Sequence, residues 1–547
     1  MLELAKHPVP PQPYNELALL AMGVGCGERT ESEPPNGVVI GFVDYGFDLL
    51  HPCLLDASGT KSRFTYLWDQ NRTPDLVRQP NLSIATVDDY PATVINRLVD
   101  TARQSVATPR TDRPQFDRAG IDAVYDPHAH YYGRAGVTDG AHGTLMATIA
   151  AGTAFDGFRS PAPFADLIGV QLAVADTDWR EETASGEPTW RDWMPANGQL
   201  WDGWRTYDAC PQIVHAIHYI YDRASHMGAD LVIINLSIGT WAGAHDGQSP
   251  VEQAIAKVMA DGRRPDATAC QVVVGAGNAG ADHGHFTETV QPGATTSFQW
   301  AMNSSDSTQN KLEIWYTGAP LEITLSPPSG HATSLLINPG TTHAIDFNGT
   351  RVGIADHVIG ARGPLSRVRL LLHPPYMIAD DAHRTDVLDW TITITNPVTS
   401  LSTDRGSTLH AWVERDDGVI ERSWLVPYHR DNTLCCLATA PDAMVVGGAQ
   451  LRPADGLLTA LPFSGLGPSP WTAIACAEIP QTRQIFGSTQ HPVMAPAYNI
   501  WGASSKSAGF TATSGTSAAA ALMSGTLAVQ HGRSSATVRP PHAASAS

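Results

Sequence analysis

The sequence lacks the features that mark disulfide scaffolds, zinc modules and membrane proteins. Its 547 residues include only seven cysteines, which are scattered and show no Cys-x-x-Cys spacing, and this pattern argues against a zinc or disulfide framework. No apolar run approaches the roughly 18 residues of a membrane span. Prolines interrupt residues 1–20, where a signal peptide would have its apolar core. We therefore expect no membrane partner and, for the chain as written, a cytoplasmic location.

Positive charge is also scarce, because 35 Lys and Arg residues face 54 Asp and Glu residues, giving a net charge of −19. This balance argues against nucleic acid or an anionic membrane as a partner, and it leaves carboxylates available for hard cations such as calcium. The 42% hydrophobic content is typical of a globular protein. The length predicts two or three domains, at about 100–200 residues each.

Apolar runs alternate with helical patterns in two stretches of the chain. The runs at 37–44, 165–172, 231–237, 270–274, 434–438 and 444–449 indicate strands buried on both faces. Helical periodicity lies between runs, at 92–104, 142–151, 211–227 and 250–259. The last of these begins with a capping box of Ser249 and Glu252. The alternation predicts an α/β fold with a doubly wound, mostly parallel sheet.

The pattern changes between residues 286 and 424, where short alternating runs separated by Gly-containing turns predict an all-β sandwich or jelly roll. We therefore divide the chain into an N-terminal arm (1–35), a first α/β part (36–285) with a polar insertion (56–135), an all-β insert (286–424), a second α/β part (425–530) and a disordered tail (531–547). In the polar insertion, His128 and His130 form a His-x-His pair. We interpret it as a surface pair, because no carboxylate cluster accompanies it.

Four polar residues stand at the ends of predicted core elements. Asp44 and Asn278 follow strands, and His142 and Ser517 open helices. In open α/β sheets the active crevice lies at the carboxyl ends of the strands, and a helix N-terminus favours neutral histidine and developing negative charge. Each residue alone also fits an ordinary cap or helix start. Together they supply an acid, a base, an amide donor and a nucleophile.

The segments around these residues resemble motifs of the subtilisin-like serine proteases, the subtilase family (peptidase S8 type). The resembling segments are Val43-Asp44-Tyr45-Gly46-Phe47-Asp48, His142-Gly143-Thr144, Asn235-Leu236-Ser237-Ile238-Gly239, Gly275-Ala276-Gly277-Asn278 and Ser514-Gly515-Thr516-Ser517-Ala518. The order Asp, His, Ser along the chain is also that of subtilisin. The chain departs from the family pattern at Tyr45, where Ser or Thr is usual, at Ala518, where Met is usual, and at Ala521, where Pro is usual.

The resemblance implies a serine endopeptidase that acts on proteins or peptides. It implies Asp44, His142 and Ser517 as catalytic residues and Asn278 as the oxyanion donor. The substrate-binding residues that it implies are Ser237, Ile238, Gly239, Gly275, Ala276 and Gly277. These would flank the primary specificity pocket, where small residues leave room for a large apolar side chain. The family also makes an extracellular location an alternative.

The resemblance implies no required cofactor. It admits a structural calcium ion, although no calcium-loop motif matches here residue by residue. The sequence does not indicate which oligomeric state the protein adopts.

Two other functions stay open at this point. One is a subtilase-fold protein with little or no activity, which the changes at Ala518 and Ala521 and the short C-terminal end would allow. The other assigns the function to the all-β insert as a binding module for a protein or carbohydrate, carried by the protease fold. We favour an insert that stabilises the fold or gates substrates, since related family members carry jelly-roll inserts at this position.

Overall fold

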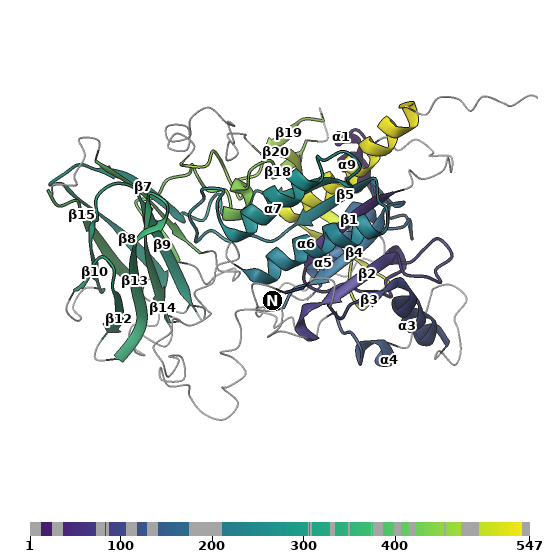
Figure 1. The fold of residues 1–547 in the computed structure, drawn as a ribbon, viewed down its shortest axis with the longest axis horizontal. Coiled ribbons are helices and arrows are strands. Elements are labelled where there is room, and N and C mark those ends of the chain that lie inside the picture. The colour runs from purple at the N-terminus through teal and green to yellow at the C-terminus, as the bar shows by residue number, and fades with distance from the viewer. Residues whose placement is uncertain are drawn as a thin grey trace, which may run out of the picture.

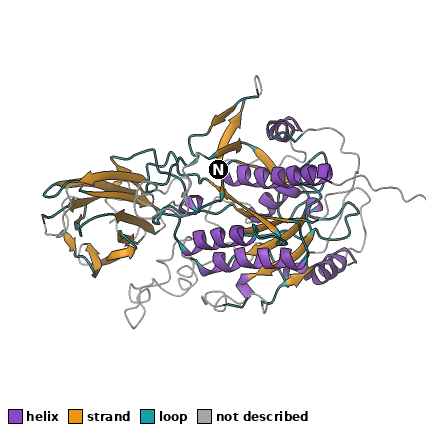
Figure 2. Cartoon of the chain, turned by 45° about the horizontal axis from the view of Figure 1, so that its top comes forward, coloured by secondary structure: helices purple, strands orange, loops and turns teal. Residues whose placement is uncertain are grey.

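The computed structural model describes residues 12–24, 37–72, 82–83, 87–104, 118–127, 141–173, 210–304, 306, 309–328, 334–347, 350–373, 375, 387–398, 406–414, 423–452, 456–471 and 492–538. Two regions lie side by side, an α/β body with helices around a sheet and a β-rich unit of strands alone (Figures 1 and 2). Among the helices in these ranges, none is long and apolar enough to cross a membrane.

The α/β body is built on a nine-stranded sheet. Its strands are β1 (Val38–Asp44), β2 (Phe64–Asp69), β3 (Tyr90–Pro91), β4 (Asp166–Gln171), β5 (Leu231–Leu236), β6 (Ala269–Gly275), β18 (Met444–Leu451), β19 (Leu458–Ala460) and β20 (Val493–Pro496). The order is β19-β18-β6-β5-β1-β4-β2-β3, with β20 also paired to β18. The pairs from β18 to β2 are parallel, and only β3 and β19 add antiparallel edges. The predicted α/β class with a mostly parallel sheet is confirmed.

Helices cover both faces of this sheet, because its strands bury side chains on both sides. They are α1 (Gln12–Ala21), α3 (Ala92–Gln104), α4 (Ala119–Asp122), α5 (His142–Ala151), α6 (Pro211–His226), α7 (Pro250–Asp261) and α9 (Thr516–Val538). In β1, Ile40 and Phe42 belong to a core with α5 and α9, whereas Val39 and Val43 belong to a second core with α6 and α7. This alternation is what a doubly wound sheet requires. A hairpin of β21 (Ile500–Ala503) and β22 (Phe510–Thr513) leads into α9.

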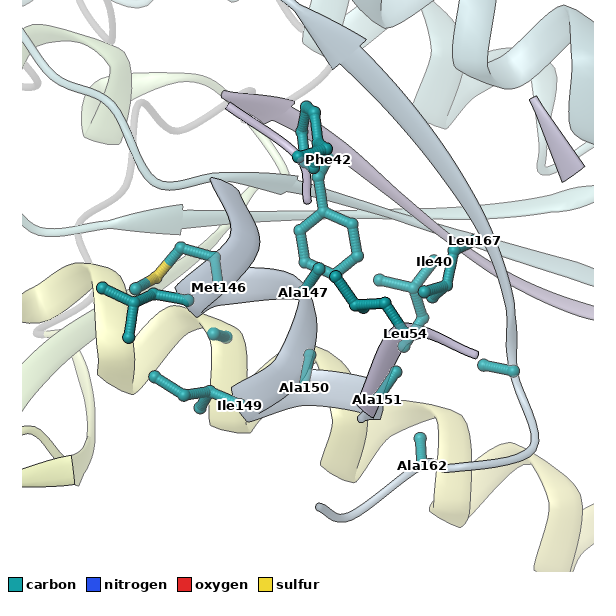
Figure 3. Packing of buried hydrophobic residues seen from close by; sticks show 14 of the residues in the cluster. Ile40, Phe42, Leu54, Met146, Ala147, Ile149, Ala150, Ala151, Ala162 and Leu167 are labelled. Carbon is teal, nitrogen blue, oxygen red and sulfur yellow. The ribbon is translucent and has the colours of Figure 1, made fainter. Parts of the chain in front are cut away.

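Small residues let α5 and α9 pack closely. A Cβ atom on Gly525 of α9 would lie 2.3 Å from the carbonyl oxygen of Ala150 in α5 and 2.4 Å from Pro161. Figure 3 shows Ala147, Ile149 and Ala150 of α5 beside the ribbon of α9. The alanines at the start of α9 therefore serve both helix formation and close approach.

The β-rich unit consists of two antiparallel sheets. Its strands are β7 (His285–Val290), β8 (Thr295–Asn303), β9 (Asn310–Tyr316), β10 (Glu322–Ser326), β11 (Leu335–Ile337), β12 (Thr342–Phe347), β13 (Thr350–Arg362), β14 (Leu365–Leu372), β15 (Val387–Thr395), β16 (Ser407–Val413) and β17 (Ser423–Val426). The sheets run β11-β10-β15-β8-β17 and β12-β13-β14-β9-β16-β7. Strand β15 alternates buried and partly exposed residues, and its inward residues Trp390, Ile392 and Ile394 join a core of their own. The predicted alternating runs therefore form strands.

Two parts of the chain differ from the sequence-based expectation. The polar insertion contributes β2, which pairs parallel with β4 inside the main sheet, because the short run from Phe64 to Asp69 is flanked by polar residues that hid it. The run at 434–438 is not a strand. It enters a short 3₁₀ helix, Cys436–Thr439, and its apolar residues are buried in the core shared with α6 and α7.

The two ends of the chain also differ. Within the N-terminal arm, α1 packs onto the body, where the amide of Asn15 donates to the Trp501 carbonyl oxygen and accepts from the Trp501 N–H. Helix α9 continues to Val538, past the predicted boundary at residue 530, although Gly532, Ser534 and Ser535 are weak helix formers. The remainder of the predicted tail, 539–547, lies outside the described residues.

Candidate active site

Asp44 and His142 meet at the carboxyl end of β1. The Nδ1 atom of His142 lies 2.8 Å and 2.9 Å from the two carboxylate oxygens of Asp44. The Asp44 side chain is 1% exposed and the His142 side chain is 33% exposed, so part of the imidazole is accessible from solvent. An imidazole that is held through Nδ1 by a buried carboxylate is oriented to exchange a proton through its other nitrogen, Nε2.

The turn after β1 is hydrogen-bonded to the first turn of α5, and these bonds fix the positions of Asp44 and His142. The N–H groups of Gly143 and Thr144 donate to the carbonyl oxygens of Tyr45 and Gly46, at 2.7 Å and 2.8 Å. A Cβ atom on Gly143 would lie 2.7 Å from the ring of Phe47, so this glycine is needed for the close approach. The Tyr45 departure therefore leaves the backbone contact intact.

Ser517 lies in the first turn of α9, where the helix dipole favours negative charge. Its hydroxyl donates to the carbonyl oxygen of Ser237 at 3.1 Å, and the Ser237 hydroxyl donates to the Ser517 carbonyl oxygen at 3.3 Å. Helices α5 and α9 pack together, with Gly525 against Ala150 about two turns after His142 and Ser517. The two helix starts thus belong to one packed pair.

Asn278 is held next to Ser517 by Thr516, the residue before the serine. Its side-chain oxygen accepts from the N–H of Thr516 at 2.8 Å and from the Thr516 hydroxyl at 3.0 Å. The Thr516 hydroxyl oxygen in turn accepts from the N–H of Gly277 at 3.1 Å. Because the oxygen is occupied in this way, the Asn278 side-chain NH₂ is left to donate elsewhere. Thr516 belongs to the Ser514–Ala518 motif, but the sequence alone does not reveal that it orients the Asn278 side chain.

The predicted substrate-binding glycines pack against two residues that the sequence analysis did not single out. A Cβ atom on Gly277, where φ is +96°, would lie 2.6 Å from the ring of Trp241 and 3.0 Å from the Cβ of Cys435. A Cβ atom on Gly239 would lie 3.0 Å from the same Cys435 Cβ. On these sides the glycines make room for Trp241 and Cys435. That the pocket admits a large apolar side chain stays a prediction.

The other predicted substrate-binding residues belong to the same two segments, 237–239 and 275–277. Ser237 and Ala276 are buried, and Ile238 is partly exposed. Gly275 faces Thr516, because a Cβ atom placed on the glycine would lie 3.2 Å from the Thr516 hydroxyl oxygen. Burial raises the pKa of Cys435 to about 12, so this thiol stays protonated at neutral pH and does not compete as a nucleophile.

The described residues contain no group of three or more His, Cys, Asp or Glu side chains placed to hold a metal ion. No residue of these ranges is therefore assigned to calcium, and the calcium expectation stays a prediction. His128 and His130 lie outside the described residues.

Comparison with protein families matches residues 35–350 to the subtilase family (peptidase S8). This range takes in Asp44, His142 and Asn278 but ends before Ser517. No curated protein sequence is significantly similar to the chain.

Comparison with solved structures supports the same fold. The CspB protease of Clostridium perfringens matches with a TM-score of 0.61 and 17% identity, over 94% of this chain and 86% of that one. An S41 psychrophilic protease and sphericase match with TM-scores of 0.35 and identities of 13% and 12%. They cover 92% and 91% of this chain and 79% and 78% of their own. Of these three, only the CspB score is high enough to indicate a shared fold.

Proposed function

The chain belongs to the subtilase family of serine peptidases, and we propose that it is a serine endopeptidase whose triad is Asp44, His142 and Ser517. The observation that carries the proposal is the contact of His142 Nδ1 with the buried Asp44 carboxylate at 2.8 Å, beside the helix pair that Ser517 opens. A serine hydroxyl is a weak nucleophile at neutral pH and needs such a base.

Each residue has a separate task in the proposed reaction. The Ser517 hydroxyl shifts its hydrogen bond from the Ser237 carbonyl oxygen to His142 Nε2. His142 takes the proton as Ser517 Oγ bonds to the peptide carbonyl carbon, and returns it to the leaving amine as the C–N bond breaks. Asp44 holds the imidazole and stabilises its cation. Water then attacks the acyl-enzyme with the same proton relay, which releases the acid and restores the serine.

Asn278 is proposed as the side-chain donor to the tetrahedral oxyanion, together with the Ser517 N–H. The contacts from Thr516 to the Asn278 side-chain oxygen support this role, since they fix the amide before substrate arrives. Preorganised donors of this kind are among the largest contributions to acyl-transfer catalysis.

The direct test is Ser517→Ala, with labelling by a fluorophosphonate and hydrolysis of a peptide library as readouts. Wild type should label and cleave, and Ser517→Ala should do neither. Ser514→Ala is the matched control, because Ser514 is an exposed neighbour whose hydroxyl oxygen only accepts from the Asn499 N–H. Labelling that persists in Ser517→Ala would remove Ser517 from the mechanism, and an unlabelled wild type would favour the inactive alternative.

We propose no metal or cofactor for the chemical step, and proteins or peptides as the substrates. Treatment with a chelator should accordingly leave the labelling rate of Ser517 unchanged. The structural calcium ion that the resemblance admits would be detected instead as a lower midpoint of thermal unfolding after chelation.

A further inference from the structure

Glu414 is a carboxylate that the proposed chemistry does not use, and it reaches from the β-rich unit into the α/β body. It follows directly after β16, and its carboxyl group is enclosed enough for burial to raise its pKa to about 7. The N–H of Trp241 donates to its Oε1 and the N–H of Ala242 to its Oε2, both at 3.2 Å. The Thr240 hydroxyl also donates to Oε2. Three consecutive residues of the body are thus bound to one carboxylate.

The turn held by Glu414 continues directly from the predicted substrate edge. Thr240 follows Gly239, the last residue of that edge, and its carbonyl oxygen accepts from the N–H of Cys436 at 2.6 Å. The indole N–H of Trp241 donates to the Thr433 carbonyl oxygen at 3.2 Å. Its ring then lies against Gly277. A shift of this turn would therefore move both glycine-bearing walls of the predicted pocket.

The cavity beside Glu414 does not offer a competing explanation as a ligand site. It is lined in part by Trp241, His285, Trp412 and Ser423 and has a volume of about 20 Å³. This is room for about one water molecule, which is too small for a peptide or sugar group.

Further contacts make the junction a fixed one. Arg362 of β13 donates to Asp246 of the body at 3.0 Å, and the rings of His245 and Trp412 stack with centroids 4.0 Å apart. The Trp412 indole N–H donates to the Asn432 carbonyl oxygen at 2.9 Å. The β-rich unit therefore presents Glu414 to the turn from a defined position.

We propose that Glu414 is a positioning residue through which the β-rich unit sets the substrate preference of the peptidase. Its carboxylate holds Thr240–Ala242, and this turn fixes the edge Ser237–Gly239 and the ring of Trp241 beside the pocket. The inference rests on the proposed function, because it assigns a use to the predicted pocket walls.

The test compares wild type with Glu414→Gln, which keeps the shape but replaces one acceptor oxygen with a donor facing backbone N–H groups. Readouts are KM and kcat on a library varied at the residue before the cleaved bond. We expect the ratio of kcat/KM between small and bulky residues to change about ten-fold or more, mainly through KM, because small displacements of positioning groups have effects of this size. Fluorophosphonate labelling of Ser517 should stay close to the wild-type rate.

Glu322→Gln is the control, since Glu322 is an exposed carboxylate of β10, in the other sheet of the β-rich unit. It should leave the preference unchanged. If Glu414→Gln does not fold, Thr240→Val removes one donor and Trp241→Phe reduces the ring, and both should alter the preference. An unchanged preference in a labelled, folded Glu414→Gln protein overturns the inference alone. An unlabelled wild type overturns the proposed function and the inference with it.

Discussion

The α/β body and the β-rich unit bury their strands in different ways. All seven residues of β1 are buried, because helices cover both faces, and its one polar side chain, Asp44, stands at the strand end. In β15 buried and partly exposed residues alternate, because the strand faces its core on one side only. The body thus places the candidate catalytic residues at one edge of its sheet, whereas the β-rich unit is a scaffold that contacts the body through polar side chains and stacked rings.

Neutralising one buried aspartate in each region should have different consequences for activity and stability. Asp44→Asn should lower kcat by about 10⁴-fold with the fold retained, because the imidazole loses its partner and preferred tautomer. Asp356→Asn, in β13, breaks contacts with Arg367 and Arg369 and should lower stability by roughly 3 kcal/mol without changing kcat. Steady-state kinetics and urea unfolding measure both. An equal loss of kcat in Asp356→Asn and Asp44→Asn would contradict the assignment of catalysis to the α/β body alone.

Asn278→Ala tests the oxyanion assignment in the body. We expect turnover to fall by about 10²–10³-fold, or roughly 2.7–4 kcal/mol, with a smaller change in KM. Thr516→Val is the companion variant, because it removes one bond to the Asn278 oxygen and should have a weaker effect in the same direction. Full turnover in Asn278→Ala would show that the oxyanion is bound by other groups.

The junction between the regions predicts a pH effect on stability. Burial lowers the pKa of His245 to about 4 and of His410 to about 3, below an unfolded value near 6.5. The unfolded chain then binds protons that the folded chain does not, so this stability is present above pH 6.5 and is lost as pH falls below it. Burial raises the pKa of Glu252 and Glu414 to about 7, which acts in the opposite direction.

A histidine variant separates these opposing contributions. Relative to His410→Gln, wild type should lose about 1.4 kcal/mol of unfolding free energy for each pH unit below about 6.5. Urea unfolding of both proteins at pH 7, 6 and 5 measures the difference. Parallel pH curves for the two proteins would mean that His410 does not titrate with folding.

A pair of glycines gives the smallest expected contrast. Gly525→Ala should destabilise the body by about 1–3 kcal/mol, because the added methyl collides with Ala150 and Pro161. Gly284→Ala, next to β7, should stay within about 0.5 kcal/mol, since its Cβ would come no closer than 3.8 Å to other atoms. Equal unfolding free energies for the two variants would show that α5 and α9 are not closely packed at Gly525.

The sequence predicts the α/β class well because buried parallel strands such as β1 and β5 are continuous apolar runs. The site candidates are also visible, since Asp44, His142 and Ser517 each lie in a short local motif. What sequence reasoning misses depends on distant partners. Strand β2 is recognisable only from its pairing with β4.

Glu414 is the clearest case of a residue hidden from sequence reasoning. Its partners, Thr240 to Ala242, lie far away along the chain, and no local pattern marks a carboxylate that binds them. Trp241 and Cys435 are hidden for the same reason, because their contacts with Gly277 exist only once the strands are assembled.

A crystal structure of the fluorophosphonate-treated protein would show whether Asp44, His142, Asn278 and Ser517 act in one site. The account predicts phosphorus bonded to Ser517 Oγ, with one phosphoryl oxygen about 3 Å from the Asn278 side-chain nitrogen and the Ser517 N–H. It also predicts His142 Nε2 within hydrogen-bonding reach of Ser517 Oγ. Phosphorus on a different side chain, or an adduct on Ser517 with His142 turned away and Asn278 out of reach, would contradict it.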